Sequence, residues 1–373
     1  AEQGHPTTWF STLQIALGMR DLVRNSEASA IFLPDGAPPL PERHLPLPAL
    51  ARTLRILASD GPDSFYSGVL AETIVADLQA GGSRIDLDDL KGYQVVEPSS
   101  LQTRHRGTDI HTAGPTSGGP RLIEALAHIE THLDRREGLS PANWKVYANA
   151  LEKAWQIHKR KIKRTTEIGS CTSHLSTVDA DGNMVALTYT LLNRFGSCVL
   201  LPRSGILMNN AVSYFDPRPG FPTTMTGGKR INASNMCPII ATRDDQARFA
   251  IGASGANHIM PCTTQIAAMM LDFGFGLEQA FNHGRIDASD RGSIRVDPRL
   301  GEEVLTALGE DFELEVAQRL VFPKLYSCPS GVSRDPNSGR CLGMNDPSQP
   351  IGGAAPPAPF RLDQTRQVDQ PRA

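Results

Sequence analysis

The side chains with the clearest chemical potential stand at the start of a predicted strand, where the run Cys171-Thr172-Ser173-His174 precedes alternating polar and apolar residues. A hydroxyl there suits an N-terminal nucleophile. Cleavage before Thr172 would create an α-amine, whose pKa is about 7.7 to 8.0 in short peptides, and this amine could take the proton of the same residue's hydroxyl. Cys171 is the alternative nucleophile, since thiolates suit the role as well. A threonine before a strand is common by itself, so the argument depends on its surroundings.

Two other motifs have simpler structural interpretations. The Gly-rich turn Thr116–Gly119 precedes a predicted helix and could hold an anion on its backbone N–H groups, but it lacks the Gly-Lys-Ser/Thr of a phosphate loop. Packing at the helix entry is therefore favoured. His174 has no Ser/His/Asp spacing to support a triad, and taken alone it reads as a core histidine. Without a phosphate loop or a Rossmann fingerprint, nucleotide binding is the least favoured function.

The bulk composition excludes several function classes. The 373 residues are 40% hydrophobic and carry a formal net charge of -3, which gives no electrostatic case for nucleic acid or an anionic membrane. The longest apolar runs, such as Ile266–Leu271, fall far short of the roughly 20 residues that a membrane span needs. The six cysteines form no CxxC pair of the kind that zinc sites use. Cys328 and Cys341 bracket a Pro/Gly/Asn-rich stretch and are the one plausible disulfide.

The elements that must position these residues change in character along the chain. Before Gly169, apolar residues recur mostly at helical spacing. Predicted helices cover Phe10–Val23, Leu47–Ala58, Val69–Gln79, the Thr116–Gly119 turn to about Leu133, and Pro141 to about Lys163 with Ser140 as N-cap. Extended stretches are predicted at Tyr93–Glu97 and Leu101–Thr112.

After Gly169 the period becomes alternating. His174–Val178 and Met184–Thr190 predict a hairpin around the turn Asp179–Asn183, and Cys237–Thr242 with Arg248–Ile251 predicts a second one. Helices at Thr263–Asp272, Leu277–Asn282 and Glu302–Leu308 and a strand at Ile294–Val296 complete an α+β pattern. The tail from about Gly352 is rich in Pro, Ala, Gln and Arg and is expected to be flexible.

From Thr172 onward the sequence resembles the small subunit of the γ-glutamyltranspeptidase family. The matching segments are, in order, TSHLSTVDADGNMVALTYTL, FGS, SGILMNN, FDPRPG, GKR, NMCP and IGASG. Upstream, Ile31–Gly36, Gly61–Tyr66 and Pro115–Gly119 resemble that family's large subunit. The likeness therefore covers nearly the whole chain.

The resemblance implies the four-layer αββα sandwich of the N-terminal-nucleophile hydrolases, made as a precursor that cuts itself between Cys171 and Thr172. Residues 1–171 would belong to the large subunit and residues 172–373 would form the small one. Carried over by position, Thr172 is the nucleophile and Thr190, on the adjacent strand, hydrogen-bonds its hydroxyl. Two family glycines whose N–H groups form the oxyanion hole correspond to Gly255 and Ala256, and an alanine can still supply the N–H. The mechanism needs no metal or organic cofactor.

The positions that would hold the substrate depart from the family. Ser234 and Asn235 match the paired serines on the α-carboxylate side of the substrate, and only the first is kept. The Asn and Asp that grip the α-amino group of a γ-glutamyl donor fall on Leu192 and Tyr214. These substitutions suggest, as an alternative, an acyl donor other than γ-glutamyl.

Two further departures concern length. The family's large subunit begins with additional sequence that carries core strands and an arginine for the substrate's α-carboxylate, and Ala1 starts after it, so a fragment is expected. The loop Phe215–Lys229, which corresponds to the active-site lid, is short, and this favours hydrolysis over transfer. Family members are commonly periplasmic, secreted or membrane-anchored, but the segment that would show an export signal is absent from this sequence.

The sequence thus predicts a self-processing amidohydrolase that cleaves γ-glutamyl amides such as glutathione, by hydrolysis or transfer, through a Thr172 acyl-enzyme. One alternative is an acylase or amidase of the same fold with a non-glutamyl donor, and another is an inactive, truncated homologue. The expected partners are a small-molecule amide and the chain's own two subunits after cleavage, with no nucleic acid and no membrane span.

Overall fold

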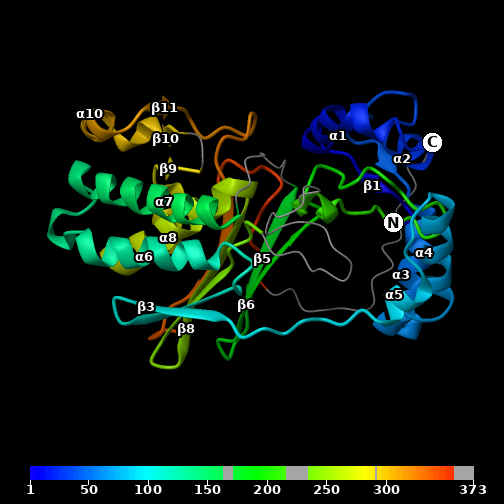
Figure 1. Cartoon of the computed structure of the whole chain (residues 1–373), viewed down its shortest axis with the longest axis horizontal. Coiled ribbons are helices and arrows are strands. Elements are labelled where there is room, and N and C mark those ends of the chain that lie inside the picture. Colours follow the sequence, from blue (N-terminus) through cyan, green and yellow to red (C-terminus); the bar gives the residue numbers. More distant parts are fainter. Residues whose placement is uncertain (163–170, 216–233, 290–291, 357–373) are drawn as a thin grey trace, which may run out of the picture.

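A six-stranded antiparallel sheet forms the centre of the computed structural model, which describes residues 1–162, 171–215, 234–289 and 292–356 (Figure 1). The strand order is β13-β12-β8-β7-β4-β3, so that three hairpins lie side by side. The strands are β3 (Leu101–His105), β4 (Thr108–Thr112), β7 (Ile239–Arg243), β8 (Gln246–Ser254), β12 (Cys328–Arg334) and β13 (Cys341–Asn345).

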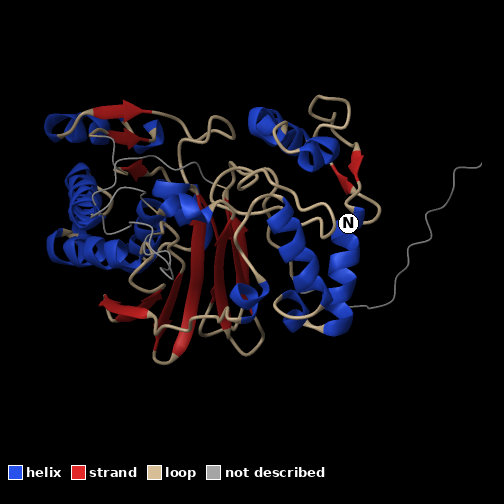
Figure 2. Cartoon of the chain, turned by 45° about the vertical axis from the view of Figure 1, so that its right-hand side comes forward, coloured by secondary structure: helices blue, strands red, loops and turns tan. Residues whose placement is uncertain are grey.

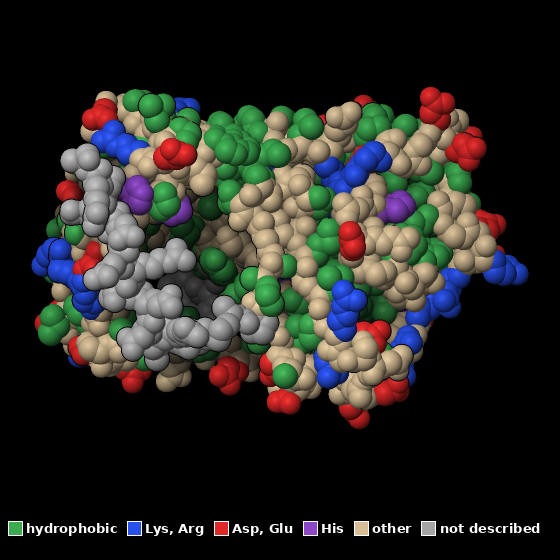
Figure 3. Space-filling model, turned by 180° about the vertical axis from the view of Figure 1, so that it is seen from behind, with side chains coloured by type: hydrophobic (Ala, Val, Ile, Leu, Met, Phe, Trp, Pro, Cys, Tyr) green, Lys and Arg blue, Asp and Glu red, His purple; other side chains and the backbone are tan. Residues whose placement is uncertain are grey.

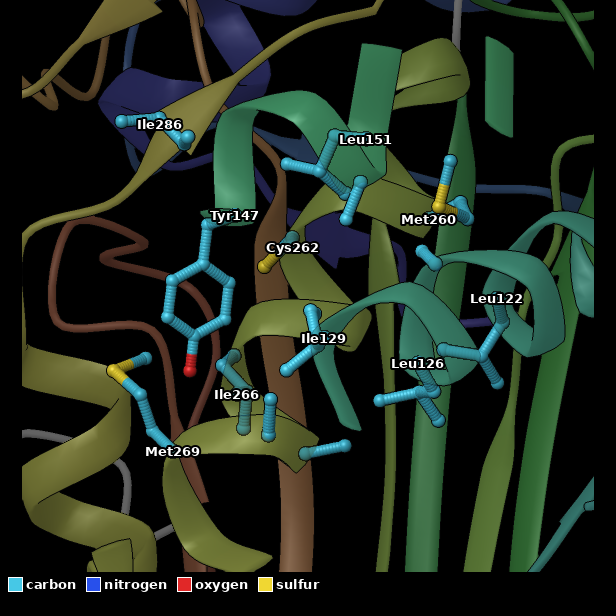
Figure 4. Close-up of a cluster of buried hydrophobic side chains, with 14 of the residues drawn as sticks. Leu122, Leu126, Ile129, Tyr147, Leu151, Met260, Cys262, Ile266, Met269 and Ile286 are labelled. Carbon is cyan, nitrogen blue, oxygen red and sulfur yellow. The ribbon is translucent and has the colours of Figure 1, made fainter. Parts of the chain in front are cut away.

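Helices α6 (Gly119–His132), α7 (Pro141–Ile162) and α8 (Ile259–Phe273) cover one face of this sheet. Their apolar side chains form the largest buried cluster, which Figure 4 shows with Leu126 and Ile129 of α6, Leu151 of α7 and Ile266 of α8 pointing toward one another. Helix α8 contacts both α6 and the strands β8 and β12. It is therefore buried along most of its length.

The other face of the sheet carries the hairpin of β5 (Thr172–Val178) and β6 (Met184–Thr190), which contacts β8 and β12. Residues of β8 alternate between the two faces: Ile251 and Ala253 join the helical core, whereas Gly252 faces the hairpin. The His174 ring lies directly over Gly252, where an added Cβ would come within 2.2 Å of the ring. Glycine is thus required there for the two layers to approach each other.

The chain before β3 forms a separate group of helices, and in Figure 2 the strands stand between that group and the helices α6–α8. Its elements are β1 (His5–Pro6), α1 (Trp9–Leu22), α2 (Ser26–Phe32), β2 (His44–Leu45), α3 (Pro48–Asp60), η1 (Pro62–Phe65), α4 (Val69–Ala80) and α5 (Leu87–Lys91). The remaining elements are η2 (Arg135–Glu137), η3 (Ala211–Tyr214), η4 (Ala256–His258), α9 (Leu277–Asn282), β9 (Ile286–Asp287), β10 (Ile294–Val296), η5 (Pro298–Leu300), α10 (Glu302–Asp311) and β11 (Leu314–Val316).

Most predicted elements are confirmed, and the mixed α+β class with them, whereas the four-layer sandwich stays a prediction. The hairpin that begins at Thr172 is present, and Ser140 caps α7 by accepting the N–H of Asn143 at 3.2 Å. The extended stretch predicted at Tyr93–Glu97 forms no strand: these residues are exposed and pair with none of the described strands. The hairpin β12–β13 was not predicted.

The proposed disulfide between Cys328 and Cys341 is also wrong. Both thiols are free, Cys328 buried and Cys341 exposed. In the β12–β13 register Cys341 lies opposite Arg334, six residues along β12 from Cys328. At about 3.3 Å per residue this separation is roughly 20 Å, far beyond the reach of a disulfide.

The described surface carries charges of both signs. On the face that Figure 3 shows, acidic and basic side chains are interspersed. None of the helices among the described residues combines the length and the apolar character that crossing a membrane requires. Residues 216–229 of the predicted lid, and the predicted flexible tail beyond residue 356, lie outside the described residues.

Candidate active site

A pocket of about 470 Å³ lies where the start of β5 meets the end of β8. The hairpin contributes its first residues, β8 contributes the turn that leads into η4, and α1 and the segment before β12 close the sides. Its described lining includes Phe10, Gln14, Cys171, Thr172, Ser173, Arg194, Ser254, Gly255, Ala256, Asn257, His258, Ser289, Lys324 and Tyr326. Four sequence-predicted residues therefore meet in one cavity: Cys171, Thr172, Gly255 and Ala256.

The hydroxyl of Thr172 lies within a short hydrogen-bonded chain. Thr172 pairs with Thr190 across the hairpin, and its Oγ1 donates to Thr190 Oγ1 at 3.2 Å. Thr190 Oγ1 in turn donates to the carbonyl oxygen of Cys171 at 3.1 Å and accepts the N–H of Leu192 at 2.9 Å. The Thr190 hydroxyl thus connects the Thr172 hydroxyl to the carbonyl of the peptide bond that precedes it.

The turn after β8 has an unusual backbone. Gly255 has φ +142° and Ala256 has φ +50°, a left-handed value that is uncommon for an alanine. A Cβ at Gly255 would lie 2.8 Å from Cα of Ser327, so glycine is needed here for packing as well. Because Ala256 is the first residue of η4, its N–H has no partner within that helix. The strained turn carries two consecutive N–H groups at the wall of the pocket, and strain of this kind is typical of functional sites.

The four predicted substrate-holding residues lie outside the described lining of the pocket. Leu192 and Tyr214 are buried. Ser234 Oγ accepts the N–H of Met236 at 3.2 Å. Asn235 Nδ2 donates to Asn257 Oδ1 at 2.6 Å. Of these two residues, only Asn257 lines the pocket.

His174 has the structural role that was predicted, although it is half-buried between the hairpin and the sheet and is not part of a hydrophobic core. Its Nδ1 lies 2.7 Å from Thr188 Oγ1 and its Nε2 lies 2.9 Å from Ser176 Oγ, both on the hairpin. Burial lowers the pKa of His174 to about 4, so the ring is neutral at physiological pH. It packs the hairpin onto the sheet two residues after Thr172.

Sequence reasoning missed a histidine–aspartate pair in the pocket wall. His258 Nδ1 lies 2.5 Å from Asp287 Oδ2 and 2.8 Å from Ser289 Oγ. Burial would raise the pKa of Asp287, but the nearby His258 and hydrogen bonds from His258 and Ser289 outweigh it and lower that pKa. No sequence pattern predicts that residues 258 and 287 meet, because they come together only when the fold places β9 beside η4.

Two cationic side chains, Arg194 and Lys324, line the pocket. Arg194 Nε donates to Gln14 Oε1 of α1 at 2.8 Å, and Lys324 Nζ donates to Ser254 Oγ at 3.0 Å. The described part of the lining contains no Asp or Glu. The described wall is thus suited to an anionic group and offers no carboxylate to an ammonium group.

A buried ion pair supports the pocket from below. Arg285 Nη2 donates to Asp346 Oδ2 at 2.9 Å and to the carbonyl oxygen of Ser327 at 3.4 Å. Ser327 Oγ then donates to the carbonyl oxygen of Ser254 at 2.7 Å, one residue before Gly255. The buried pair therefore fixes the end of β8 from which the turn starts.

Among the described residues, no group of three or more His, Cys, Asp or Glu side chains is arranged to hold a metal ion. The chemistry that the described pocket supports uses a hydroxyl, backbone N–H groups, a histidine–aspartate pair and cations.

Comparison with known proteins finds both a family model and individual relatives that match this chain. The sequence model of the family described as Gamma-glutamyltranspeptidase matches residues 1–163 and 148–355. The Acylase ACY 1 proenzyme of Pseudomonas sp. (strain SE83) is 28% identical over 346 residues, which cover 83% of this chain and 62% of that relative. The Glutathione hydrolase proenzyme of Escherichia coli (strain K12) is 29% identical over 321 residues, covering 72% of this chain and 55% of that relative. The chain thus spans less than two thirds of the length of both.

A solved structure shares the fold. The cephalosporin acylase from Bacillus halodurans superimposes with a TM-score of 0.81 at 21% sequence identity. The superposition covers 93% of this chain and 70% of that protein.

Proposed function

The chain belongs to the γ-glutamyltranspeptidase family, and on that premise we propose that it is a self-processing amidohydrolase with Thr172 as its N-terminal nucleophile. The observation that carries the proposal is the place of the Thr190 hydroxyl, which contacts the Thr172 hydroxyl and the Cys171 carbonyl oxygen. These two groups are the nucleophile and the carbonyl of a cut before Thr172. A hydroxyl that contacts both can hold them in position for the attack.

In self-cleavage, Thr172 Oγ1 attacks the carbonyl carbon of Cys171, the bond from that carbon to the Thr172 nitrogen breaks, and the nitrogen takes up the proton of the hydroxyl. Water then hydrolyses the ester that joins Cys171 to the Thr172 oxygen. The products are residues 1–171 and 172–373, with a free α-amine on Thr172. Cys171 is exposed, which supports access of water to this bond.

Turnover uses the same nucleophile on a substrate amide. The α-amine takes the proton of the Thr172 hydroxyl, which attacks the amide carbon, and the amine of the substrate leaves with that proton. The N–H groups of Gly255 and Ala256 stabilise the oxyanion, a contribution of about 10²- to 10³-fold in rate for each donor. Water or an acceptor amine then releases the acyl group from Thr172. This assignment is supported by the shared pocket of Thr172 and the strained turn.

The described wall favours an acyl donor that carries a carboxylate and lacks an α-amino group. Arg194 and Lys324 supply positive charge, and the described lining supplies no carboxylate for an ammonium. The positions that the resemblance assigns to the amino group hold Leu192 and Tyr214, both buried outside that lining. We therefore place an acylase with a glutaryl-like donor first and a γ-glutamyl hydrolase, acting on compounds such as glutathione, second. The relatives' names include both kinds of enzyme.

Intact-mass analysis tests the self-processing part of the proposal. The purified chain should yield two fragments, the smaller beginning at Thr172, whereas Thr172→Ala should stay whole. Thr172→Ser keeps a hydroxyl and should still be cut, which separates loss of the nucleophile from misfolding. An uncut wild-type chain would support the inactive homologue and withdraw the catalytic proposal.

A matched pair of chromogenic amides tests the donor. Glutaryl-p-nitroanilide and L-γ-glutamyl-p-nitroanilide have the same carboxylate and leaving group and differ only in the α-amino group. We expect the glutaryl compound to have the higher kcat/KM, and Arg194→Met to lower it. Preference for the γ-glutamyl compound would restore glutathione-type substrates to first place.

A further inference from the structure

The histidine–aspartate pair in the pocket wall has no role in the reaction described so far. His258 is the last residue of η4, two residues after Ala256, and its backbone N–H donates to the carbonyl oxygen of Gly255 at 3.0 Å. The turn that supplies the N–H groups for the oxyanion therefore also carries this ring. Thr172 lines the same cavity.

The contacts of the ring select one nitrogen for the pocket. Both partners, Asp287 and Ser289, lie at Nδ1, and Asp287 is buried. With Asp287 ionised, Nδ1 carries the proton and donates it to the carboxylate, which leaves the lone pair on Nε2. The side chain of His258 is 15% exposed and lines the cavity, so Nε2 is the atom that is left to face it.

His258 differs from the other ionisable side chains of the wall in its ability to accept a proton. Arg194 and Lys324 are cations, and burial raises the pKa of Tyr326 further above neutrality. After the cut, Cys171 would be the last residue of the large subunit. Among the described lining residues that belong to the small subunit, His258 is thus the side chain whose ring offers a nitrogen lone pair to a proton.

We propose that His258, oriented by Asp287, is a second general base of this pocket and activates water for hydrolysis of the Thr172 acyl-enzyme. The inference rests on the function proposed above. Nε2 takes a proton from water, the water oxygen bonds to the acyl carbon, and the bond from that carbon to Thr172 Oγ1 breaks. The proton passes from Nε2 to Thr172 Oγ1, and the carboxylic acid leaves.

This role separates the two half-reactions. The α-amine of Thr172 is attached to the nucleophile and serves the attack on the amide. His258, which lines the same pocket, acts on the second nucleophile, water. Its loss should therefore slow release of the acyl group while the first half-reaction continues, and the acyl-enzyme should accumulate.

The experiment uses the processed wild-type protein and His258→Gln, whose amide can still donate to Asp287. Each is mixed rapidly with whichever p-nitroanilide the wild type hydrolyses. We expect the variant to process itself, release about one equivalent of p-nitroaniline in a burst, and then turn over about 10²-fold more slowly or worse, the usual range for loss of a general base. The mass of the fragment that begins at Thr172 should increase by the acyl group.

Hydroxylamine distinguishes a base from a structural support. It attacks the ester without help from a base, so it should restore turnover of His258→Gln toward the wild-type rate. His132→Gln, a substitution of an exposed histidine on α6, is the control and should behave as wild type. Asp287→Asn covers the case in which His258→Gln fails to fold, because it keeps the ring but removes the carboxylate that fixes its tautomer; it should also accumulate acyl-enzyme.

Three results would overturn the inference. If His258→Gln releases its acyl group at the wild-type rate, water is activated elsewhere and the proposed function survives. If the burst itself disappears in the variants that still process themselves, the pair serves acylation or supports the turn. If the wild type neither cuts itself nor turns over, the proposed function and this inference fall together.

Discussion

The contact between His174 and Gly252 predicts a strong and specific effect of one added methyl group. In Gly252→Ala the new Cβ would lie 2.2 Å from Cε1 and 2.3 Å from Nδ1 of His174. Ordinary contact begins about 1.2 Å farther out, so the ring or the whole hairpin must move.

The cost follows from what the ring would lose. Overpacking of this kind costs about 1 to 3 kcal/mol. A displaced ring also gives up its hydrogen bonds to Thr188 and Ser176, each worth about 1 kcal/mol. We expect Gly252→Ala to lower the free energy of unfolding by about 3 to 5 kcal/mol, and to slow self-cleavage because β5 starts only two residues before His174.

A double-mutant cycle isolates this contact. It is measured by denaturant unfolding in the Thr172→Ala background, where the chain stays whole and stability does not depend on two fragments. With His174→Ala already present, the methyl group meets an empty space, and Gly252→Ala should cost about 1 kcal/mol or less. Gly353→Ala is the control, because no atom of the described residues lies within 4 Å of the new Cβ.

One result would refute this: Gly252→Ala lowers the free energy of unfolding by the same amount whether residue 174 is His or Ala. The hairpin would then not be held to β8 through this ring, and the link from the sheet to Thr172 would have to lie elsewhere.

Three further predictions follow from the contacts of the site. Because the pKa of His174 is lowered to about 4 in the folded protein, the unfolded chain binds the proton first on acidification. The free energy of unfolding should therefore fall by up to roughly 3 kcal/mol between pH 6.5 and 4 through this residue. Denaturation of His174→Gln, measured over the same pH range, should lack this component. Thr190→Val should slow self-cleavage roughly tenfold or more in a timed gel assay, and Thr190→Ser should restore it, since only the hydroxyl makes the bridge. Reduction should change neither the mass nor the stability of the protein, because Cys328 and Cys341 are unpaired; a mass increase of two protons would contradict this.

The surroundings of Thr172 were predictable because they are local in sequence. The alternation from Thr172 to Thr190 and the turn Asp179–Asn183 specify the hairpin and its register without any help from the rest of the chain. The same alternation places His174 on the face of the hairpin that packs against β8. Helices α1, α3 and α4 were predictable for the same reason, since apolar spacing is a local signal.

The rest of the site depends on contacts that no local pattern encodes. His258 and Asp287 meet because β9 lies beside η4, and Lys324 reaches Ser254 across the end of the sheet. Strand β12 (Cys328–Arg334) was missed because Pro, Ser and Gly dilute its β propensity, and its pairing with β8 compensates. Tyr93–Glu97 are the opposite case: their β propensity is high, but they pair with none of the described strands and are exposed.

The two halves of the site are held by different layers, and this explains how one arrangement can serve both self-cleavage and turnover. Thr172 is fixed by its register with Thr190 within the hairpin, whereas the turn at Gly255 is fixed from β12 through Ser327 and the buried pair beneath it. Cleavage would break the chain before Thr172, and the contacts that it affects are those of Cys171: its N–H donates to the Leu192 carbonyl, and its carbonyl oxygen accepts from the Thr190 hydroxyl. Thr172 can therefore stay in place while the carbonyl that it attacks in the proposed reaction changes from that of Cys171 to that of a substrate. The contact of His174 with Gly252 and the hydrogen bond from Ser330 Oγ to the His174 carbonyl oxygen hold the hairpin on the sheet.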